Sequence, residues 1–281
     1  MGVENKMERL KVFPSMIFQT NSTVFVGESF VLVVDPTWFP EEVRAIRDYV
    51  DQVKGDRELY IFYTHADYDH IIAAGLFADA IPIGSVSMKM YPEKERELER
   101  TRQFDRNHYV KREYPVVFPE IEIVITEDGQ EIQLGETTAT CYLTPGHTFD
   151  GAMLYLHTYG VWVVGDHFSD VELPLINSVE DYKQTVSKVH RWWDQIQDEI
   201  NWMIPGHGLA TSDRMEMERR LQESQYYLDE LEKIALDTDE DQLNELRDKI
   251  CIPPNDFIQK CHNENIAKMK EYLLKQERPE K

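Results

Sequence analysis

The segment THADYDH, at residues 64–70, follows an apolar stretch whose composition predicts a β-strand. It contains four side chains of the kinds that bind metal ions, namely His65, Asp67, Asp69 and His70. In an extended segment, side chains two positions apart point to the same side, so the first two can converge. If the chain then turns into a helix, the last two point elsewhere. Two pairs of ligands aimed at neighbouring points suit two metal ions better than one.

Three further segments place a ligand-type residue beside glycine at the end of a predicted strand, where glycine permits tight turns and close backbone approach. They are LTPGH, ending at His147, VVGD, ending at Asp166, and IPGH, ending at His207. Imidazoles are ligands that zinc favours, and a carboxylate can bridge two cations or add affinity for harder ions. A single histidine or aspartate of this kind is usually structural. Four strand ends that all carry ligand-type residues together predict a metal site. The other histidines lack such company and are expected to be structural: His108, His157, His167, His190 and His262.

The composition is that of an ordinary globular protein, with 281 residues of which 42% are hydrophobic. The formal net charge of −22 argues against nucleic-acid binding through a broad basic face. No apolar run approaches the roughly 18 to 20 residues of a membrane span, and the first residues lack a signal-peptide pattern. Three cysteines without a close pair are typical of structural thiols in a reducing compartment. We therefore expect a cytoplasmic protein with a small-molecule substrate and with neither nucleic acid nor membrane as a partner.

Short apolar or alternating segments, separated by turn residues, predict strands along the chain as far as His207. The predicted strands cover residues 11–19, 22–27, 30–36, 58–64, 81–85, 121–129, 130–135, 137–144, 151–158, 160–166 and 200–208. Apolar positions at helical spacing predict helices over residues 40–50, 71–79 and 178–196. This alternation predicts an α/β or α+β sheet protein without choosing among sheet architectures.

Residues 86–114 are dense in charge and in helix-forming residues. Their basic side chains are Lys89, Lys94, Arg96, Arg100, Arg102, Arg106, Lys111 and Arg112. A solvated helix with many ion pairs is the ordinary interpretation of such a stretch. The alternative is a lid or an insertion that contacts substrate, with arginines that meet an acidic group.

From about residue 212 the pattern is almost wholly helical. Four apolar residues in this part have the spacing of ordinary buried helix faces, namely Leu231, Ile234, Leu243 and Leu246. We predict a domain of residues 1–212 and a helical extension, residues 213–281, packed on it. The extension could shape the substrate pocket or form the contact of a homodimer.

The order HxxxDH, PGHT, GD and PGHG resembles the pattern of the metallo-β-lactamase superfamily, over roughly residues 10 to 210. The resemblance implies an α+β fold, the four-layer αββα sandwich, with metal ions between the edges of the inner sheets. By position it also implies two divalent ions with these ligands: His65, residue 67 and His147 for the first, Asp69, His70 and His207 for the second, and Asp166 for both.

One position departs from the family pattern, which usually reads HxHxDH, because Asp67 stands where the second histidine is expected. Aspartate is shorter and negatively charged, so it either reaches the first metal with some adjustment or leaves that site weaker. Three carboxylates would offset three of the four charges on two divalent ions, which makes a bound water less acidic than in a histidine-rich site. Zinc is the expected metal, and the added carboxylate favours Fe²⁺ or Mn²⁺ as the alternatives.

Hydrolysis is the function that the ligand set and the resemblance predict. Two metal ions would hold a water or hydroxide and polarise an ester, lactone, thioester, amide or phosphoester oxygen. Asp69 and Asp166 are the expected catalytic residues, because they could orient that nucleophile while binding metal. Tyr68 is a weaker candidate for protonating the leaving group.

Two other functions follow from the acid at position 67. The superfamily includes flavo-diiron oxygen and nitric-oxide reductases with a glutamate at the matching position, so a di-iron redox or gas-binding protein is one alternative. Those proteins normally carry a flavodoxin-like domain after the metal domain, whereas the residues after 212 contain no phosphate-cradling loop. The other alternative is a member that binds a ligand or partner without catalysis, if Asp67 fails to reach the metal.

Overall fold

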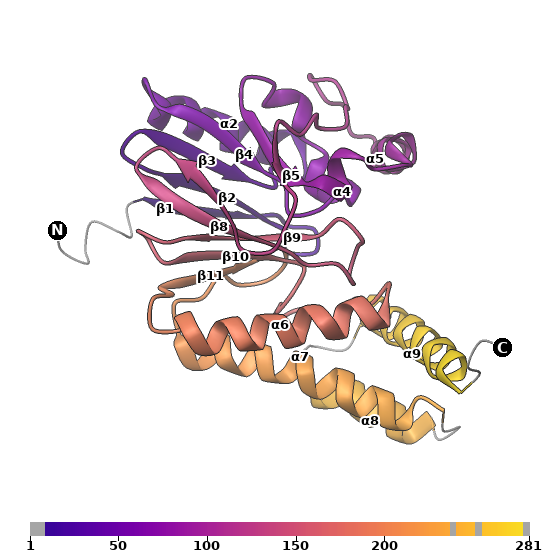
Figure 1. Ribbon diagram of the computed structural model, residues 1–281. Helices are drawn as coiled ribbons and strands as arrows, with labels where there is room; N and C mark the ends of the chain where they lie inside the picture. The colour runs from indigo at the N-terminus through magenta and orange to yellow at the C-terminus, as the bar shows by residue number, and fades with distance from the viewer. Residues whose placement is uncertain (1–8, 237–239, 251–254, 278–281) are drawn as a thin grey trace.

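Two β-sheets stack face to face in the computed structural model, which describes residues 9–236, 240–250 and 255–277 (Figure 1). In the first sheet the strands follow chain order: β1 (Leu10–Pro14), β2 (Asn21–Val26), β3 (Phe30–Val34), β4 (Glu58–Phe62), β5 (Ile81–Ser85) and β6 (Ile123–Ile125). The second has the order β11 (Trp202–Pro205), β10 (Val161–Gly165), β9 (Ala152–Leu156), β8 (Thr137–Leu143) and β7 (Gln130–Leu134). Strands β3 to β6 are parallel, as are β10 and β11, so each group has its carboxyl ends at one edge.

Helices cover the outer faces of both sheets. Helix α2 (Pro40–Lys54) lies on the first sheet and α6 (Val179–Ile196) on the second, which gives the layer order helix, sheet, sheet, helix in Figure 1. The others are α3 (Tyr68–Ile71), the 3₁₀ helix η1 (Ala74–Leu76), α4 (Val86–Lys89), α5 (Lys94–Asn107), α7 (Arg214–Ile234), α8 (Glu240–Lys249) and α9 (Asp256–Gln276). The expected α+β fold, a four-layer αββα sandwich, is thereby confirmed.

The alternation of side chains along the strands divides the core into layers. In β3, Phe30 and Leu32 pack between the two sheets, whereas Val31 and Val33 pack against α2. In β10, Trp162 packs against α6. Because the central strands are buried on both faces, their sequences are apolar throughout and do not alternate with polar residues.

The C-terminal helices pack on the sandwich through α6, which contacts both α7 and α9. Their shared core contains Tyr182 of α6, Leu228 of α7 and Met269 of α9. Of the four apolar residues expected to be buried, three are buried and Ile234 is partly buried. The helical extension is therefore present and packed as expected, while a domain boundary at residue 212 stays a prediction. Among the described residues, no helix is long and apolar enough to cross a membrane.

The helix predicted over residues 71–79 is wrong, because the chain forms the short α3 and then η1. Tertiary packing is the reason. A Cβ added at Gly75 would lie 2.0 Å from the carbonyl oxygen of Pro115, so this stretch fits against neighbouring backbone. Helix α3 also begins earlier, at Tyr68, and it includes the last three residues of the THADYDH segment.

The strand predicted over residues 11–19 is too long, because β1 ends at Pro14. Phe18 and Gln19 have φ angles of +53° and +49°, in the left-handed region that no strand adopts. The turn that they form brings the carbonyl oxygen of Phe18 to within 3.0 Å of Nδ1 of His207. This turn thus makes a contact with a residue far along the chain, which the hydrophobic pattern of the sequence cannot predict.

The charged stretch of residues 86–114 divides into α4 and α5. Three of its arginines pair with nearby glutamates on the helix surface: Arg96 with Glu93, Arg102 with Glu95, and Arg106 with Glu99. This is the solvated, ion-paired helix of the ordinary interpretation. Arg100 differs, because its guanidinium lies 3.5 Å from Asp67 in the THADYDH segment.

Candidate metal centre

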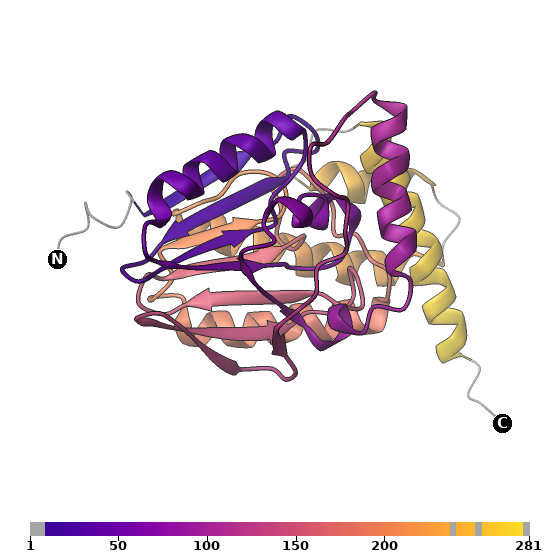
Figure 2. The same ribbon diagram turned by 90° about the horizontal axis from the view of Figure 1, so that it is seen from above.

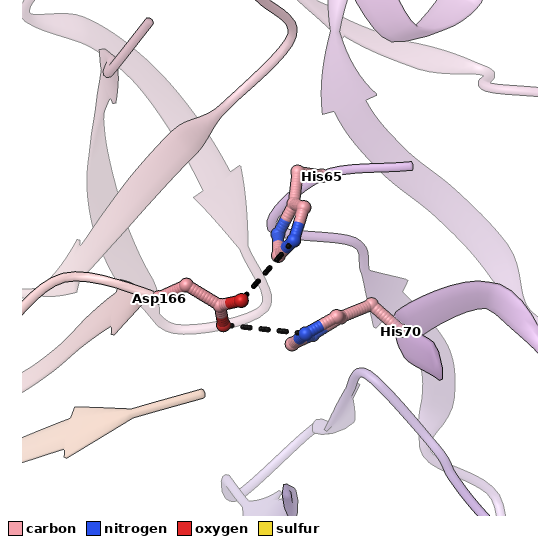
Figure 3. A group of neighbouring side chains, drawn as sticks. All are labelled: His65, His70 and Asp166. Carbon is pink, nitrogen blue, oxygen red and sulfur yellow. Dashed lines mark ion pairs between the residues drawn. The ribbon is translucent and has the colours of Figure 1, made fainter. Parts of the chain in front are cut away.

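The predicted ligands come together at one end of the sandwich, where the strands that precede them end. They come from the loop after β4, from α3 and from the loops after β8, β10 and β11, in chain order His65, Asp67, Asp69, His70, His147, Asp166 and His207. Figure 3 shows His65 and His70, from the first sheet's side, converging on Asp166, from the second. The site therefore lies where the two sheets meet.

Two groups of three ligand-type residues lie side by side: His65, Asp67 and His147, and Asp69, His70 and His207. In the first group, the histidine Nε2 atoms lie 3.9 and 3.8 Å from Oδ2 of Asp67. In the second, they lie 3.5 and 3.6 Å from Oδ2 of Asp69. Ligand atoms that share one ion at about 2.0 to 2.2 Å are themselves roughly 3 to 4 Å apart, so each group has the spacing of a metal site.

Asp166 lies between the two groups. Its carboxylate oxygens are 3.2 to 3.5 Å from the Nε2 atoms of four histidines: His65, His70, His147 and His207. Burial alone would raise the pKa of Asp166, but the surrounding histidines hold that pKa well below its ordinary value. The side chain is therefore a carboxylate that contacts both groups, as a bridging ligand does.

Each of the four histidines turns one ring nitrogen toward the protein and the other toward the shared space. The Nδ1 atoms lie 2.9 to 3.0 Å from oxygen atoms: Oγ1 of Thr64 for His65, Oδ2 of Asp35 for His70, and the carbonyls of Leu175 and Phe18 for His147 and His207. A carbonyl oxygen only accepts hydrogen bonds, so in the last two histidines Nδ1 carries a proton, and Nε2 is the nitrogen that can bind a metal ion.

Several atoms that face the shared space have no hydrogen-bond partner. Within the described part of the chain, Nε2 of His65, His70 and His147 and Oδ1 of Asp166 are buried without a hydrogen bond. Buried polar atoms in folded proteins are nearly always paired. Three imidazole nitrogens and a carboxylate oxygen are a donor set for zinc or iron, so the residues present fit a metal centre.

Asp35, at the end of β3, is the residue that orients this site and that the sequence did not identify. Its carboxylate accepts hydrogen bonds from the backbone N–H of Thr64 at 3.0 Å and from the Thr64 hydroxyl at 2.6 Å. It also lies 2.9 Å from Nδ1 of His70. A buried aspartate therefore fixes the ring of one candidate ligand and the backbone before another.

Asp35→Asn should weaken binding of the second metal ion by about 10- to 100-fold, which is the usual effect of losing the partner of a ligand histidine. The amide NH₂ presents donors where the Thr64 hydroxyl and His70 Nδ1–H need an acceptor. Competition with a coloured chelator measures the affinity. Asp79→Asn, at a partly exposed acid paired with Arg47, is the matched control and should leave the affinity unchanged. Equal affinities in the two variants would contradict the role of Asp35.

Asp67 lies in the first group, but its carboxylate also has a second neighbour. Oδ2 faces His65 and His147, while Oδ1 is 3.5 Å from Nη1 of Arg100. Burial alone would raise the pKa of Asp67, but the two histidines and Arg100 lower it below the ordinary value. Asp67 is thus charged, and its carboxylate lies between the candidate metal site and Arg100 of α5.

Glu172 is a second residue near the centre that sequence reasoning missed. Its side chain is buried, and Oε1 lies 3.8 Å from Nδ1 of His207. Burial raises the pKa of Glu172 to about 7. The nearby Asp166 also raises this pKa, whereas His207 lowers it. It lies in a segment without regular structure, so no periodicity or strand end marks it in the sequence.

The five histidines expected to be structural lie outside the metal groups found among the described residues. His167, which follows Asp166, is buried and stacks on Tyr182 with 5.2 Å between ring centroids. Burial, together with the neighbouring His147, lowers its pKa to about 3. A neutral imidazole packed on an aromatic ring agrees with a structural role.

The centre opens into a cavity of about 230 Å³. Asp67, Asp69 and Asp166 lie on its floor, Arg100 comes from α5, and Lys268 comes from α9. Its volume is below the roughly 300 to 1,000 Å³ of pockets for drug-sized ligands. The cavity therefore has the size for a small molecule, and the C-terminal extension supplies one of its walls.

The sequence matches a known family over most of its length. A family model described as the metallo-beta-lactamase superfamily matches residues 16–225. No curated protein matches the sequence.

Several solved structures share the fold at low identity. A metallo-beta-lactamase family protein from Thermus thermophilus has 18% identity and a TM-score of 0.60, and the match covers 96% of this chain and 94% of that one. The sec-alkylsulfatase Pisa1 from Pseudomonas sp. has 14% identity and a TM-score of 0.65, and the match covers 90% of this chain and 47% of that one. This chain therefore spans about half the length of the alkylsulfatase. Rubredoxin oxygen:oxidoreductase from Desulfovibrio gigas has 14% identity and a TM-score of 0.53, with 79% and 60% covered.

Proposed function

Because the chain belongs to the metallo-beta-lactamase superfamily, we propose that it is a metal-dependent hydrolase of a small molecule, which cleaves an ester, lactone, thioester, amide or phosphoester bond. One observation carries the proposal. Two triads of ligand-type side chains flank Asp166, and unpaired buried atoms of the site point into the space between them. A dinuclear centre is the arrangement that pairs all of these atoms.

The residues divide into two sets by the ion that each would hold. His65, Asp67 and His147 would hold the first, Asp69, His70 and His207 the second, and Asp166 would contact both. When bound, two divalent ions supply an activated water molecule and polarise the oxygen of the bond to be cleaved. Zinc suits the four imidazoles, while the carboxylate of Asp67 adds affinity for iron or manganese.

The chain's own side chains would orient the water and supply a proton. Asp69 and Asp166 line the cavity, and their carboxylates can orient an attacking water by hydrogen bonds. Tyr68 lines the same cavity, and its ring lies 4.5 Å from the guanidinium of Arg100. Burial, reinforced by Asp69, raises the pKa of Tyr68 to about 12, so its hydroxyl is protonated at neutral pH and can donate to a leaving group.

A panel of substrates tests the proposal. The purified chain, loaded separately with zinc, iron and manganese, should hydrolyse at least one member of a set of esters, lactones, thioesters and phosphodiesters. Removal of the metal by a chelator should abolish that activity, and adding the metal back should restore it. A chain that holds two ions yet hydrolyses nothing in the panel would contradict the proposal.

A di-iron redox or gas-binding protein is the second candidate, and the position of Asp67 favours it. The aspartate makes the first group richer in oxygen ligands, and harder ions such as iron gain from that. The fold is also shared with rubredoxin oxygen:oxidoreductase. Iron-loaded protein should then change its visible spectrum on exposure to oxygen or nitric oxide. A colourless, zinc-filled protein without such a change would exclude this candidate.

A further inference from the structure

Two basic side chains other than histidine line the cavity over the metal centre, Arg100 of α5 and Lys268 of α9. Figure 2 shows both helices at the same end of the molecule, and Figure 1 shows them apart, α5 on the side of the first sheet and α9 on the side of the second. The charge of Arg100 is already balanced, because its guanidinium lies 2.8 Å from Glu97 and 3.5 Å from Asp67. Arg100 therefore has little charge to offer to a substrate.

Lys268 has no such counter-charge. Among the described residues, no carboxylate forms an ion pair with its ammonium group, which donates instead to the neutral Oδ1 of Asn177 at 2.7 Å. Glu264, one turn before Lys268 in α9, also lines the cavity, but its carboxylate pairs with Lys260 at 3.8 Å. The ammonium group of Lys268 is thus held at the cavity wall by the side-chain amide of Asn177. Its positive charge is available to bind a substrate.

The position of Lys268 is fixed relative to the metal centre. Asn177, its partner, also donates through Nδ2 to the carbonyl oxygen of His147. Asn265, one turn earlier in α9, accepts from the backbone N–H of Ile176 at 3.0 Å. The segment that carries the hydrogen-bond partner of His147 is therefore tied to α9 at two points, and the ammonium group lies two hydrogen bonds from a candidate ligand.

The charge of the loaded centre adds to that of Lys268. Two divalent ions carry four positive charges, of which the three carboxylates Asp67, Asp69 and Asp166 offset three. Glu172 also lines the cavity, beside His207. The cavity is small, and most of its lining is polar, with an apolar part that includes Phe18 and Phe257, whose ring centroids are 5.2 Å apart. A lysine without an ion pair, in a small cavity beside a metal centre, binds a small organic anion better than a neutral compound.

We propose that Lys268 binds an anionic group of the substrate, a carboxylate or a phosphate, so that the enzyme acts on a small anionic compound. The proposal rests on the hydrolase function, and it names the substrate class. The bond to be cleaved lies over the metal centre, while the anionic group lies at α9. The C-terminal extension thus supplies a specificity residue to a site whose other parts come from the sandwich.

A matched pair of esters tests this inference in the metal-loaded full chain. We compare para-nitrophenyl hydrogen adipate, which ends in a carboxylate, with para-nitrophenyl hexanoate, each corrected for spontaneous hydrolysis. Hydrogen bonds to charged groups contribute enough that the wild type should prefer the anionic ester by about tenfold or more in kcat/KM. Lys268→Met should raise KM for the anionic ester by about the same factor, with little change in kcat for either ester. Lys268→Arg should keep most of the preference.

The control is Lys270→Met, because Lys270 lies on the same helix but lines a different groove, against α8. It should leave both esters unchanged. A merely structural Lys268 would lower the activity toward both esters alike. A preference that is absent in the wild type, or that survives in Lys268→Met, would overturn the inference while leaving the hydrolase function intact.

Binding measurements separate this inference from the hydrolase function. If neither ester is hydrolysed, calorimetric titration with succinate and with neutral succinamide decides on Lys268 alone. Succinate should bind the wild type about tenfold more tightly than Lys268→Met, and succinamide should show no such difference. Equal succinate affinities would overturn the inference. Comparing succinate with β-phosphonopropionate shows whether the site prefers a carboxylate or a phosphate-like group.

Discussion

Asp166→Ala is expected to abolish the proposed hydrolytic activity, with a loss of about 1,000-fold or more in kcat/KM, because metal ions supply several kcal/mol of transition-state stabilisation. The Asp166 carboxylate lies within 3.2 to 3.5 Å of all four histidine Nε2 atoms. Its removal leaves four imidazoles facing one another without an acid to bridge the two ions. Steady-state kinetics at saturating zinc measures the loss.

Asp198→Ala is the control for this variant. Asp198 is an exposed acid that pairs with Arg214 at the surface, away from the cavity, so its loss should leave kcat/KM within about twofold of the wild type. Circular dichroism should show the same fold in both variants. Retention of a tenth or more of the activity in Asp166→Ala would show that the chemistry does not depend on the dinuclear arrangement.

Gly206→Ala should lower kcat/KM by about 100-fold while the sandwich stays folded, because a shift of about 1 Å in a reacting group can cost that much. A Cβ at this position would lie 2.1 Å from Oδ1 of Asp166 and 3.0 Å from Cε1 of His70. Since no real contact is that short, the carboxylate must move away from its place between the two groups. Kinetics and metal titration of the same preparation measure the effect.

The matched control for Gly206→Ala is Gly129→Ala. At Gly129 an added Cβ meets no atom within 4 Å, although its φ of +77° makes alanine strained by about 1 kcal/mol. Gly129→Ala should therefore lose some stability in thermal unfolding but keep full activity. Gly206→Ala should instead lose activity and keep its stability. Full activity in Gly206→Ala would mean that Asp166 can move without consequence.

The candidate ligands could be predicted because the segments that carry them follow strands. His65 follows β4 and Asp166 follows β10, and both strands run parallel to a neighbour. Parallel strands bring their carboxyl ends to one edge of their own sheet, and the stacking of the two sheets brings these edges together. Their grouping into two triads follows from the turn at Tyr68, where α3 begins. Where a ligand motif spans the end of a strand and the start of a helix, the sequence alone predicts how its side chains divide into groups.

The residues that orient and enclose the site could not be predicted in this way. Asp35 follows a strand, but a single aspartate there is the usual sign of a turn. Glu172 lies in a segment without periodicity, and Lys268 is one lysine among several on a charged helix. Its contact with Asn177 joins positions 91 residues apart, which only the packing of α9 on the sandwich decides. A local sequence pattern predicts only local structure, whereas this part of the site depends on tertiary contacts.

Metal analysis of the purified chain tests the central claim most directly. Wild-type protein equilibrated with zinc and freed of excess metal should contain about two ions per chain, because the two triads form separate sites that share Asp166. His147→Ala and His207→Ala should each lower that content to about one, since each histidine belongs to a different triad. A wild type that retains no metal, or variants that keep the full content, would contradict a dinuclear centre at these residues.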